Sequence, residues 1–401
     1  MQSRNRVLTA LLINSALLST LMLGLPPATR PKTLEKEKLQ RPRQLDSGIT
    51  WRRDPATGEL HIIPKSGAVQ SSADAAPVDA HTIQVVTQMV PVTCSVYTVD
   101  GAPVPGLNRA DFIVFEDGLE QRISYFDASH QPASVALVID ASPSVLRDAE
   151  EMRRAADGLI DALAPLDQAA VVDFSAHTYL QASFSDVREL IRRAVARVDV
   201  NQLLGDTGGS NIYKAVYLTA KDLFPRRSGR KAIVLLTDGQ DSGLGLTLDP
   251  ASARPSAGSP DRLTFDDVSR LLSAEDIQVF VVSTENRPRI MTPEWLASHA
   301  NETLLTTTAP RSGIPAYTLY LAELVRRSGG QLYFLREAET LAGTFRQIAR
   351  RIRAEYVLGY YPARGMAAPG NSRWHSLRVE VVKHSGVIVN HRATYYVPAL
   401  P

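Results

Sequence analysis

Residues 134–144 read SVALVIDASPS, and the predicted fold class follows from this segment. Residues 135–139 form an uninterrupted apolar run, which is typical of a strand buried on both faces of a parallel sheet. A second run of this kind, KAIVLLT at 231–237, ends immediately before Asp238. Both runs therefore predict central strands of one sheet, and each strand delivers an aspartate at its carboxyl end.

Helical and extended patterns alternate around these two strands. Helices are predicted at 147–163, 187–198, 211–223, 265–274, 317–328 and 341–354, and further strands at 169–174, 179–184, 277–283 and 331–334. Such alternation is the pattern of a doubly wound, mostly parallel sheet with helices on both faces. The predicted fold class is α/β, with this domain at 131–355.

Short strands separated by turns flank the α/β region on both sides. The N-terminal β segment is expected at 83–130 and the C-terminal β segment at 356–401, with Asp-Gly turns at 100–101 and 117–118. Each segment alone is short for a stable sandwich. We therefore expect the two to pair, so that one β-sandwich carries the α/β domain as an insertion.

The N-terminus has the features of an export signal. Arg4 and Arg6 precede an uncharged run at 7–25, which is also close to the roughly 20 residues that span a bilayer. Residues 1–28 are predicted to be a signal peptide or a membrane anchor. The protein is therefore expected to be exported, as a periplasmic, cell-surface or secreted protein, or anchored in an inner membrane. Residues 29–82 predict a largely disordered linker with one hairpin-like patch at 49–63.

Composition excludes several classes of function. Lys and Arg number 44 against 42 Asp and Glu, so the total charge gives no support for nucleic-acid binding. Cys94 is the single cysteine, which excludes an internal disulfide and a multi-cysteine zinc site. It lies in an alternating apolar run and is expected to be a small buried hydrophobic residue. The histidines are dispersed, and the motifs of aspartate-nucleophile phosphatases, serine hydrolases and Walker phosphate loops are absent.

Oxygen-bearing side chains gather at the predicted carboxyl edge of the sheet. Ligands of open α/β sheets bind at this edge, where the strand order reverses. Two carboxylates and three hydroxyls form the candidate metal site: Asp140, Ser142, Ser144, Ser210 and Asp238. Hard oxygen ligands suit Mg²⁺ or Mn²⁺, which commonly keeps one position for an external ligand. Gly208 and Gly209 are expected to permit a tight approach to the ion.

Each motif has a simpler explanation when it is taken singly. Asp-x-Ser is often a helix N-cap, and Thr-Asp-Gly is an ordinary turn. Their occurrence together, in order and at strand ends, favours metal binding. Asp241 lies close enough to touch a second ion, but a solvated loop carboxylate is the expected role.

These motifs resemble the metal-ion-dependent adhesion site of von Willebrand factor type A domains, over roughly 133–354. Asp140, Ser142, Ser144 and Asp238 match the family motif, and Ser210 stands where the family commonly has threonine; Thr207 is a weaker candidate for that hydroxyl. The flanking motifs at 99–118 and 356–361 resemble exported VWFA-related proteins of Acidobacteria. The resemblance implies Mg²⁺ or Mn²⁺ as cofactor and a partner protein that offers a carboxylate.

Three functions from different classes fit this sequence. The favoured one is an exported, metal-dependent protein-binding module of adhesion or assembly, with no enzymatic activity. The second is a scaffold or switch whose site is occupied from within the same chain. The third is a metal-assisted hydrolase, which would need a general base near the ion. Two insertions, 244–262 and 285–315, are predicted to form the rim of the binding surface.

Overall fold

The computed structural model describes most of the folded part of the chain. The described residues are 39–55, 57–64, 89–99, 101–129, 131–142, 145, 149–198, 209–225, 227–244, 261–292, 295, 305, 314–334, 341–353, 355–362, 373–382, 384 and 386–397. The predicted signal or anchor at 1–28 and most of the two insertions lie outside them. Within the described part, no helix combines the length and apolar character that a membrane crossing requires.

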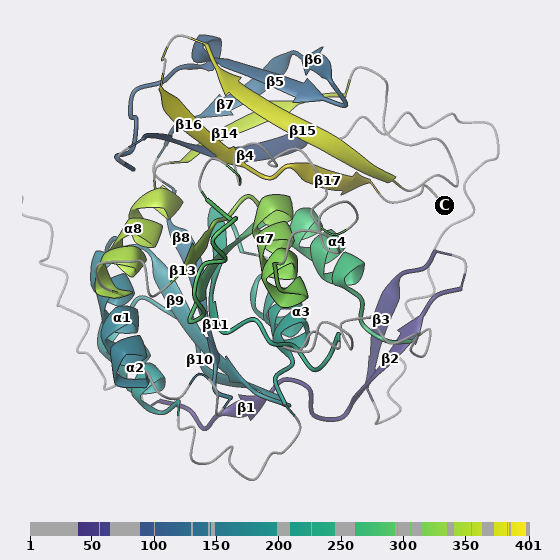
Figure 1. Cartoon of the computed structure of the whole chain (residues 1–401), viewed down its shortest axis with the longest axis vertical. Coiled ribbons are helices and arrows are strands. Elements are labelled where there is room, and N and C mark those ends of the chain that lie inside the picture. The colour runs from purple at the N-terminus through teal and green to yellow at the C-terminus, as the bar shows by residue number, and fades with distance from the viewer. Residues whose placement is uncertain are drawn as a thin grey trace, which may run out of the picture. The chain divides into compact units, whose positions relative to one another are not determined.

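A seven-stranded sheet forms the centre of the α/β domain (Figure 1). In spatial order its strands are β1 (Arg43–Gln44), β10 (Thr178–Ser185), β9 (Gln168–Phe174), β8 (Ala133–Asp140), β11 (Arg230–Thr237), β12 (Ile277–Ser283) and β13 (Leu332–Phe334). The strands from β9 to β13 are parallel, and β10 and β1 extend the sheet antiparallel. The predicted doubly wound, mostly parallel α/β fold is confirmed.

In the part of the chain that the structure describes, helices cover both faces of the sheet (Figure 1). One face packs against α1 (Ala149–Ala162), α2 (Arg188–Ala196) and α8 (Leu341–Arg353), and the other against α3 (Ile212–Leu223), α4 (Phe265–Glu275) and α7 (Ala316–Ser328). All eight residues of β8 are buried, because helices cover both sides of a central strand. This burial explains why its sequence is continuously apolar up to Asp140.

Residues 39–64 belong to the α/β domain rather than to a linker. β1 hydrogen-bonds to β10, and the predicted hairpin forms as β2 (Ile49–Arg53) and β3 (Leu60–Pro64). Trp51 packs edge-on against Tyr217 of α3, with 5.5 Å between ring centroids. The polar composition of this stretch masked a few apolar and charged side chains that dock on the domain, so its assignment to a disordered linker was wrong.

The flanking segments form a two-sheet β-sandwich. One sheet is β16 (Val387–His391), β4 (Val90–Thr98), β14 (Glu355–Tyr360) and β7 (Ile123–Asp127); the other is β17 (Thr394–Val397), β15 (Arg373–Val381), β5 (Phe112–Glu116) and β6 (Leu119–Gln121). A single-turn 3₁₀ helix, Arg109–Asp111, precedes β5. Strands from both ends of the chain lie side by side in each sheet. Cys94 is buried in the sandwich core.

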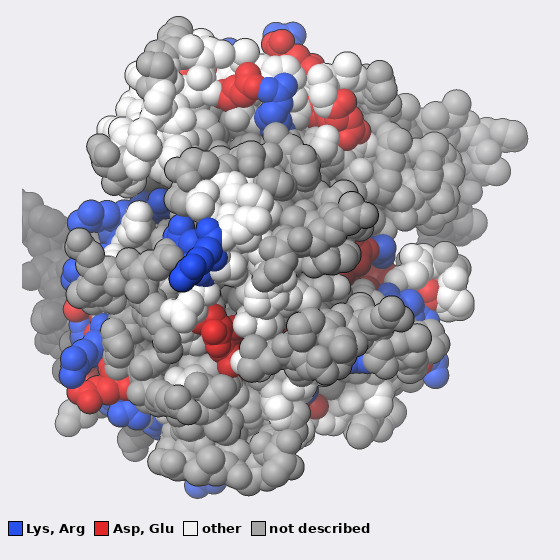
Figure 2. Space-filling view, in the orientation of Figure 1, with Lys and Arg blue, Asp and Glu red and all other residues white. Residues whose placement is uncertain are grey.

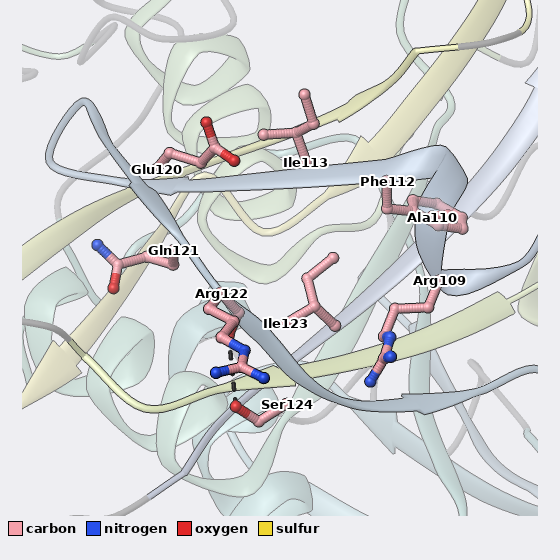
Figure 3. Close-up of a pocket in the computed structure, with 9 residues that line it drawn as sticks. All are labelled: Arg109, Ala110, Phe112, Ile113, Glu120, Gln121, Arg122, Ile123 and Ser124. Atoms are coloured by element: carbon pink, nitrogen blue, oxygen red, sulfur yellow. Dashed lines mark hydrogen bonds between the residues drawn. The ribbon is translucent and has the colours of Figure 1, made fainter.

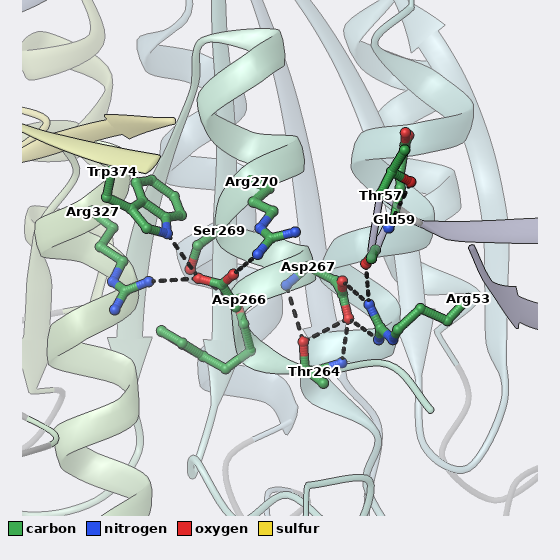
Figure 4. Close-up of polar contacts among 12 residues, drawn as sticks. Arg53, Thr57, Glu59, Thr264, Asp266, Asp267, Ser269, Arg270, Arg327 and Trp374 are labelled. Atoms are coloured by element: carbon green, nitrogen blue, oxygen red, sulfur yellow. Dashed lines mark hydrogen bonds and ion pairs between the residues drawn. The ribbon is translucent and has the colours of Figure 1, made fainter. Parts of the chain in front are cut away.

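Helix α4 ties the hairpin and the sandwich to the α/β domain (Figure 4). Thr264 caps the helix through a capping box with Asp267, which satisfies backbone donors at its first turn. Arg53 of β2 forms an ion pair with Asp267 at 2.7 Å. On the other side, the Trp374 indole of β15 donates to Asp266 at 3.0 Å. One helix thus anchors elements from both flanks.

The described surface over α1 and α2 carries charges of both signs (Figure 2). Ion pairs such as Arg154–Glu150 at 2.6 Å and Arg193–Glu189 at 3.9 Å neutralise it locally. This mixture is typical of a solvated face and does not form the single-sign patch that nucleic-acid binding requires.

Candidate metal centre

The candidate centre lies at the switch point of the sheet. β8 is the first strand of the parallel sheet along the chain, and its two neighbours, β9 and β11, are reached by crossovers in opposite directions. The loops that follow β8 and β11 therefore diverge at their carboxyl ends and leave a crevice between them. Asp140 ends β8, and Asp238 directly follows β11.

Asp140 is fully buried and receives three hydrogen bonds. The backbone amide of Ser142 donates to Oδ1 at 3.0 Å, and the hydroxyls of Ser210 and Thr237 donate to Oδ2 at 3.1 and 2.6 Å. The three predicted segments thus converge on this carboxylate. Thr237 is a contributor that was not predicted as a site residue, although it stood in the quoted Thr-Asp-Gly motif.

Asp238 is also buried and keeps one carboxylate oxygen without a protein partner. Its Oδ1 accepts from the Gln240 amide at 2.9 Å, whereas Oδ2 has no hydrogen-bond partner among the described residues. Burial, and then repulsion from Asp238, raise the pKa of Asp140 to about 6. Two adjacent buried acids with an unsatisfied oxygen form an arrangement that a divalent cation would neutralise. The residues therefore fit a hard metal ion with oxygen ligands.

Backbone hydrogen bonds hold the loops of the centre in place. Ala141 N donates to Phe174 O at 2.8 Å, and Ser242 N donates to Ser210 O at 2.7 Å. Gly209 has φ +77°, and a Cβ there would lie 2.1 Å from the Ser242 hydroxyl. The close approach that this glycine permits is therefore to the neighbouring loop, rather than to an ion as the sequence suggested.

The structure describes only some of the remaining predicted site residues. Ser210 lies two residues before α3 and contacts Asp140, which supports it as the hydroxyl of the middle motif. Ser144, Thr207 and Gly208 lie outside the described residues.

Asp241 differs from its expected role as a solvated carboxylate. It is fully buried beside the start of α3, where the amides of Leu244, Ile212 and Tyr213 donate to it. Burial raises its pKa to about 6. It borders a hollow of about 180 Å³ that Lys214 and Arg262 also line. The turn-like sequence after Asp238 gave no sign that the hairpin and α3 would enclose it.

A second hollow lies in the sandwich, away from this centre (Figure 3). It measures about 470 Å³ and is lined by residues of 109–124. Figure 3 shows the carboxylate of Glu120 and the guanidinium of Arg122 pointing in different directions. Its polar groups do not converge, so the edge of the α/β sheet remains the candidate functional site.

The fold and the site define an α/β domain with oxygen ligands at its switch point. Residues 134–312 match the family model of the von Willebrand factor type A domain. This part of the chain is a von Willebrand factor type A domain, as the resemblance implied. The helices and strand that complete it, α7, β13 and α8, extend beyond the matched range.

The chain is similar to several solved structures at low identity. An aerotolerance-related membrane protein from Bacteroides fragilis is 16% identical over 55% of this chain and 98% of its own, with a TM-score of 0.38. A von Willebrand factor type A protein from Catenulispora acidiphila is 13% identical over 79% and 75%, with a TM-score of 0.36. Proximal thread matrix protein 1 of the mussel byssus, with a zinc-occupied MIDAS motif, is 14% identical over 58% and 48%, with a TM-score of 0.38. The search of curated proteins gives no match.

Proposed function

We propose that this protein is an exported, metal-dependent protein-binding module of adhesion or assembly. A divalent cation, Mg²⁺ or Mn²⁺, is held by Asp140, Ser142, Ser144, Ser210 and Asp238. The observation that carries the proposal is the unpartnered Asp238 Oδ2, buried beside Asp140 at the switch point of the sheet. A buried anionic oxygen without a donor costs free energy unless a cation or a proton neutralises it.

The ligand set also suits capture of an external carboxylate. When bound, the cation supplies an electrophilic position for a partner's acidic side chain. The hydroxyl of Ser210 and the amide of Ser142 orient the Asp140 carboxylate. Arg262 borders the adjacent hollow and favours an anionic partner segment there, whereas Lys214 on the same hollow is already paired with Asp46 at 2.8 Å. The acidic groups of the centre act as ligands in this proposal, so it assigns no catalytic step.

The proposal also includes export of the protein and a binding surface bordered by two insertions. Export rests on Arg4 and Arg6 before the apolar run 7–25, the order found in secretion signals. The insertions 244–262 and 285–315 leave from the carboxyl ends of β11 and β12, the same edge as the metal centre. They are therefore placed to select the partner.

The test is calorimetric titration of the full chain with Mg²⁺ and with Mn²⁺, beside Asp140→Ala and Asp238→Ala. We expect one ion per chain at this centre and loss of that binding in both variants, with circular dichroism unchanged. The matched control is Asp222→Ala, an exposed acid on α3 paired with Arg43, which should bind as the parent does. Equal Mg²⁺ affinity in the parent and both site variants would refute the assignment.

A further inference from the structure

A second group of metal-type ligands lies in the β-sandwich. Glu116 ends β5, Asp117 follows it in the turn to β6, and His375 is in β15. One ligand atom from each of the three side chains lies within 4.8 Å of the other two. The imidazole Nδ1 of His375 is 2.9 Å from Asp117 Oδ2 and 3.3 Å from Glu116 Oε1.

Glu116 is buried with an unsatisfied oxygen. Its exposed fraction is 8%, and its Oε2 has no well-aligned hydrogen-bond donor among the described residues. His375 is 3% exposed, and its ring stacks on Tyr395 at 5.2 Å between centroids. The hydroxyls of Tyr360 and Tyr395 lie beside the Glu116 carboxylate. The Glu116 carboxylate is therefore enclosed by the His375 imidazole and two tyrosine side chains.

The charge of the group is not balanced by the protein. Among the described residues no lysine or arginine forms an ion pair with Glu116 or Asp117, and the recorded ion-pair partner of both is His375. Even a protonated imidazole would leave two carboxylates with one positive charge. Glu116 is the buried carboxylate of the two, and a buried anion that no lysine or arginine neutralises is costly. A divalent cation would remove the imbalance.

The backbone fixes this geometry before any ligand arrives. Asp117 has φ +49°, in the left-handed region, which sets the tight turn to Gly118. Its Oδ1 accepts from the Ser376 amide at 2.9 Å, and its own amide donates to Ser376 O at 3.1 Å. The acid and the histidine are therefore held by paired strands. Asp117 is also partly exposed, which leaves an entry path for an ion.

We propose that Glu116, Asp117 and His375 form a binding site for a divalent transition metal of the zinc type. In a tetrahedral zinc site, with bonds of about 2.0–2.1 Å, neighbouring ligand atoms lie about 3.3 Å apart. The two distances to Nδ1 are close to that spacing. Three protein ligands leave a fourth position for water. The imidazole nitrogen distinguishes this set from the all-oxygen centre of the α/β domain, which favours harder ions.

Such a site would act as a staple across the inserted domain. His375 and Asp117 are separated by 258 positions in the sequence, and the α/β domain lies between them. A link that closes so long a loop restricts the unfolded chain strongly in the loop-entropy model. The chain has one cysteine, so no internal disulfide can do this. The site is independent of the function proposed for the α/β domain.

The experiment uses the full chain carrying Asp140→Ala, which removes the other metal centre. After chelator treatment it is titrated with Zn²⁺ by calorimetry, and the melting temperature is followed. We expect one zinc ion per chain and a rise in Tm of about 5 °C at a hundredfold excess over Kd. Adding His375→Gln removes a ligand, so zinc affinity should fall by more than the roughly 10- to 100-fold that changes to residues behind the ligands produce. His384→Gln, at an exposed histidine of the same sandwich, is the matched control.

A second variant distinguishes the loss of a zinc ligand from misfolding. Asp117→Asn alters a partly exposed side chain and should also weaken zinc binding, with circular dichroism unchanged. Cobalt(II) in place of zinc should give a visible absorption spectrum that disappears in His375→Gln. Absence of zinc binding, or binding that His375→Gln leaves unchanged, would overturn the proposal and leave the group as an imidazole bridging two carboxylates.

Discussion

The α/β domain buries acidic side chains under two opposite conditions. Along the seam where α4 meets α7, each buried acid has arginine partners: Asp267 pairs with Arg53, and Glu323 with Arg326 and Arg327 at 2.7 Å. Burial raises the pKa of Glu323, but the two arginines outweigh it and lower the pKa overall. At the carboxyl edge of the sheet no arginine or lysine ion pair is recorded for the described acids Asp140, Asp173 and Asp241, and their pKa values are raised to about 6.

The difference separates a structural use of buried charge from a functional one. At the seam, Asp267 of α4 holds Arg53 of the hairpin, and Glu323 holds two arginines of its own helix, α7. Under the proposed function, the acids at the edge that lack an ion pair lower the stability of the fold and serve cation binding. Perturbed pKa values are expected at such a functional site. Removing a carboxylate charge should therefore lower the free energy of unfolding at the seam and raise it at the edge of the sheet.

The largest effect is expected at the seam, from Glu323→Ala. This change removes the carboxylate that Arg326 and Arg327 share, and both arginines are largely buried. Arg327 keeps its longer ion pair with Asp266, at 3.3 Å. We expect a loss of about 3 to 5 kcal/mol in the free energy of unfolding, measured by urea denaturation. Asp222→Ala breaks an exposed pair with Arg43 and should cost less than about 1 kcal/mol. Similar losses of unfolding free energy in both variants would show that the buried ion pairs of the seam stabilise the fold no more than an exposed pair does.

An intermediate effect of opposite sign is expected from Asp173→Asn. The folded pKa of about 6 lies above the unfolded value of 3.8 because of burial, despite the hydrogen bond from Gln181. The charged carboxylate therefore destabilises the fold fully above pH 6, and this cost disappears as the pH falls below about 4. We expect Asp173→Asn to stabilise the protein by about 1 to 3 kcal/mol at pH 7.

The measurement is urea denaturation of both proteins at pH 7, 6 and 5. The advantage of the variant should shrink as the pH falls. A variant that is less stable than the parent at pH 7 would show that Asp173 belongs with the paired acids of the seam.

The smallest effect is expected at the N-terminal cap of α4. Thr264→Ala removes the hydroxyl that caps the helix and contacts Asp267 at 2.6 Å. We expect a loss of about 1 kcal/mol in the free energy of unfolding. Thr264→Ser keeps the hydroxyl and should be nearly neutral. Equal losses in the two variants would assign the effect to the lost methyl packing rather than to the cap.

Much of the fold could be predicted because its signals are local. The continuous apolar runs identified β8 and β11, and the periodic patterns predicted the helices to within a few residues. Asp140, Ser210 and Asp238 could be chosen as site residues because parallel strands bring their carboxyl ends to one edge.

The rest depends on contacts between distant parts of the chain. Asp241 becomes buried only because α3 and the hairpin close over it. The group around His375 forms because β15 pairs with β5, and nothing in the spacing of the histidines indicates that pairing. The docking of residues 39–64 likewise depends on Trp51 and Arg53 finding partners on α3 and α4. Such sites depend on tertiary contacts, and no periodic pattern in the sequence predicts them.

The interleaving of the two chain ends in the sandwich has a consequence for biosynthesis. β4 and β5 emerge from the ribosome long before β14 and β15, and contacts such as Asp117–His375 span 258 positions. At about 5–20 residues per second, the early strands wait roughly 10 to 50 s for their partners. During that interval their apolar faces and strand edges are open to aggregation. The von Willebrand domain can collapse first, whereas the sandwich is completed only when the last strands are released.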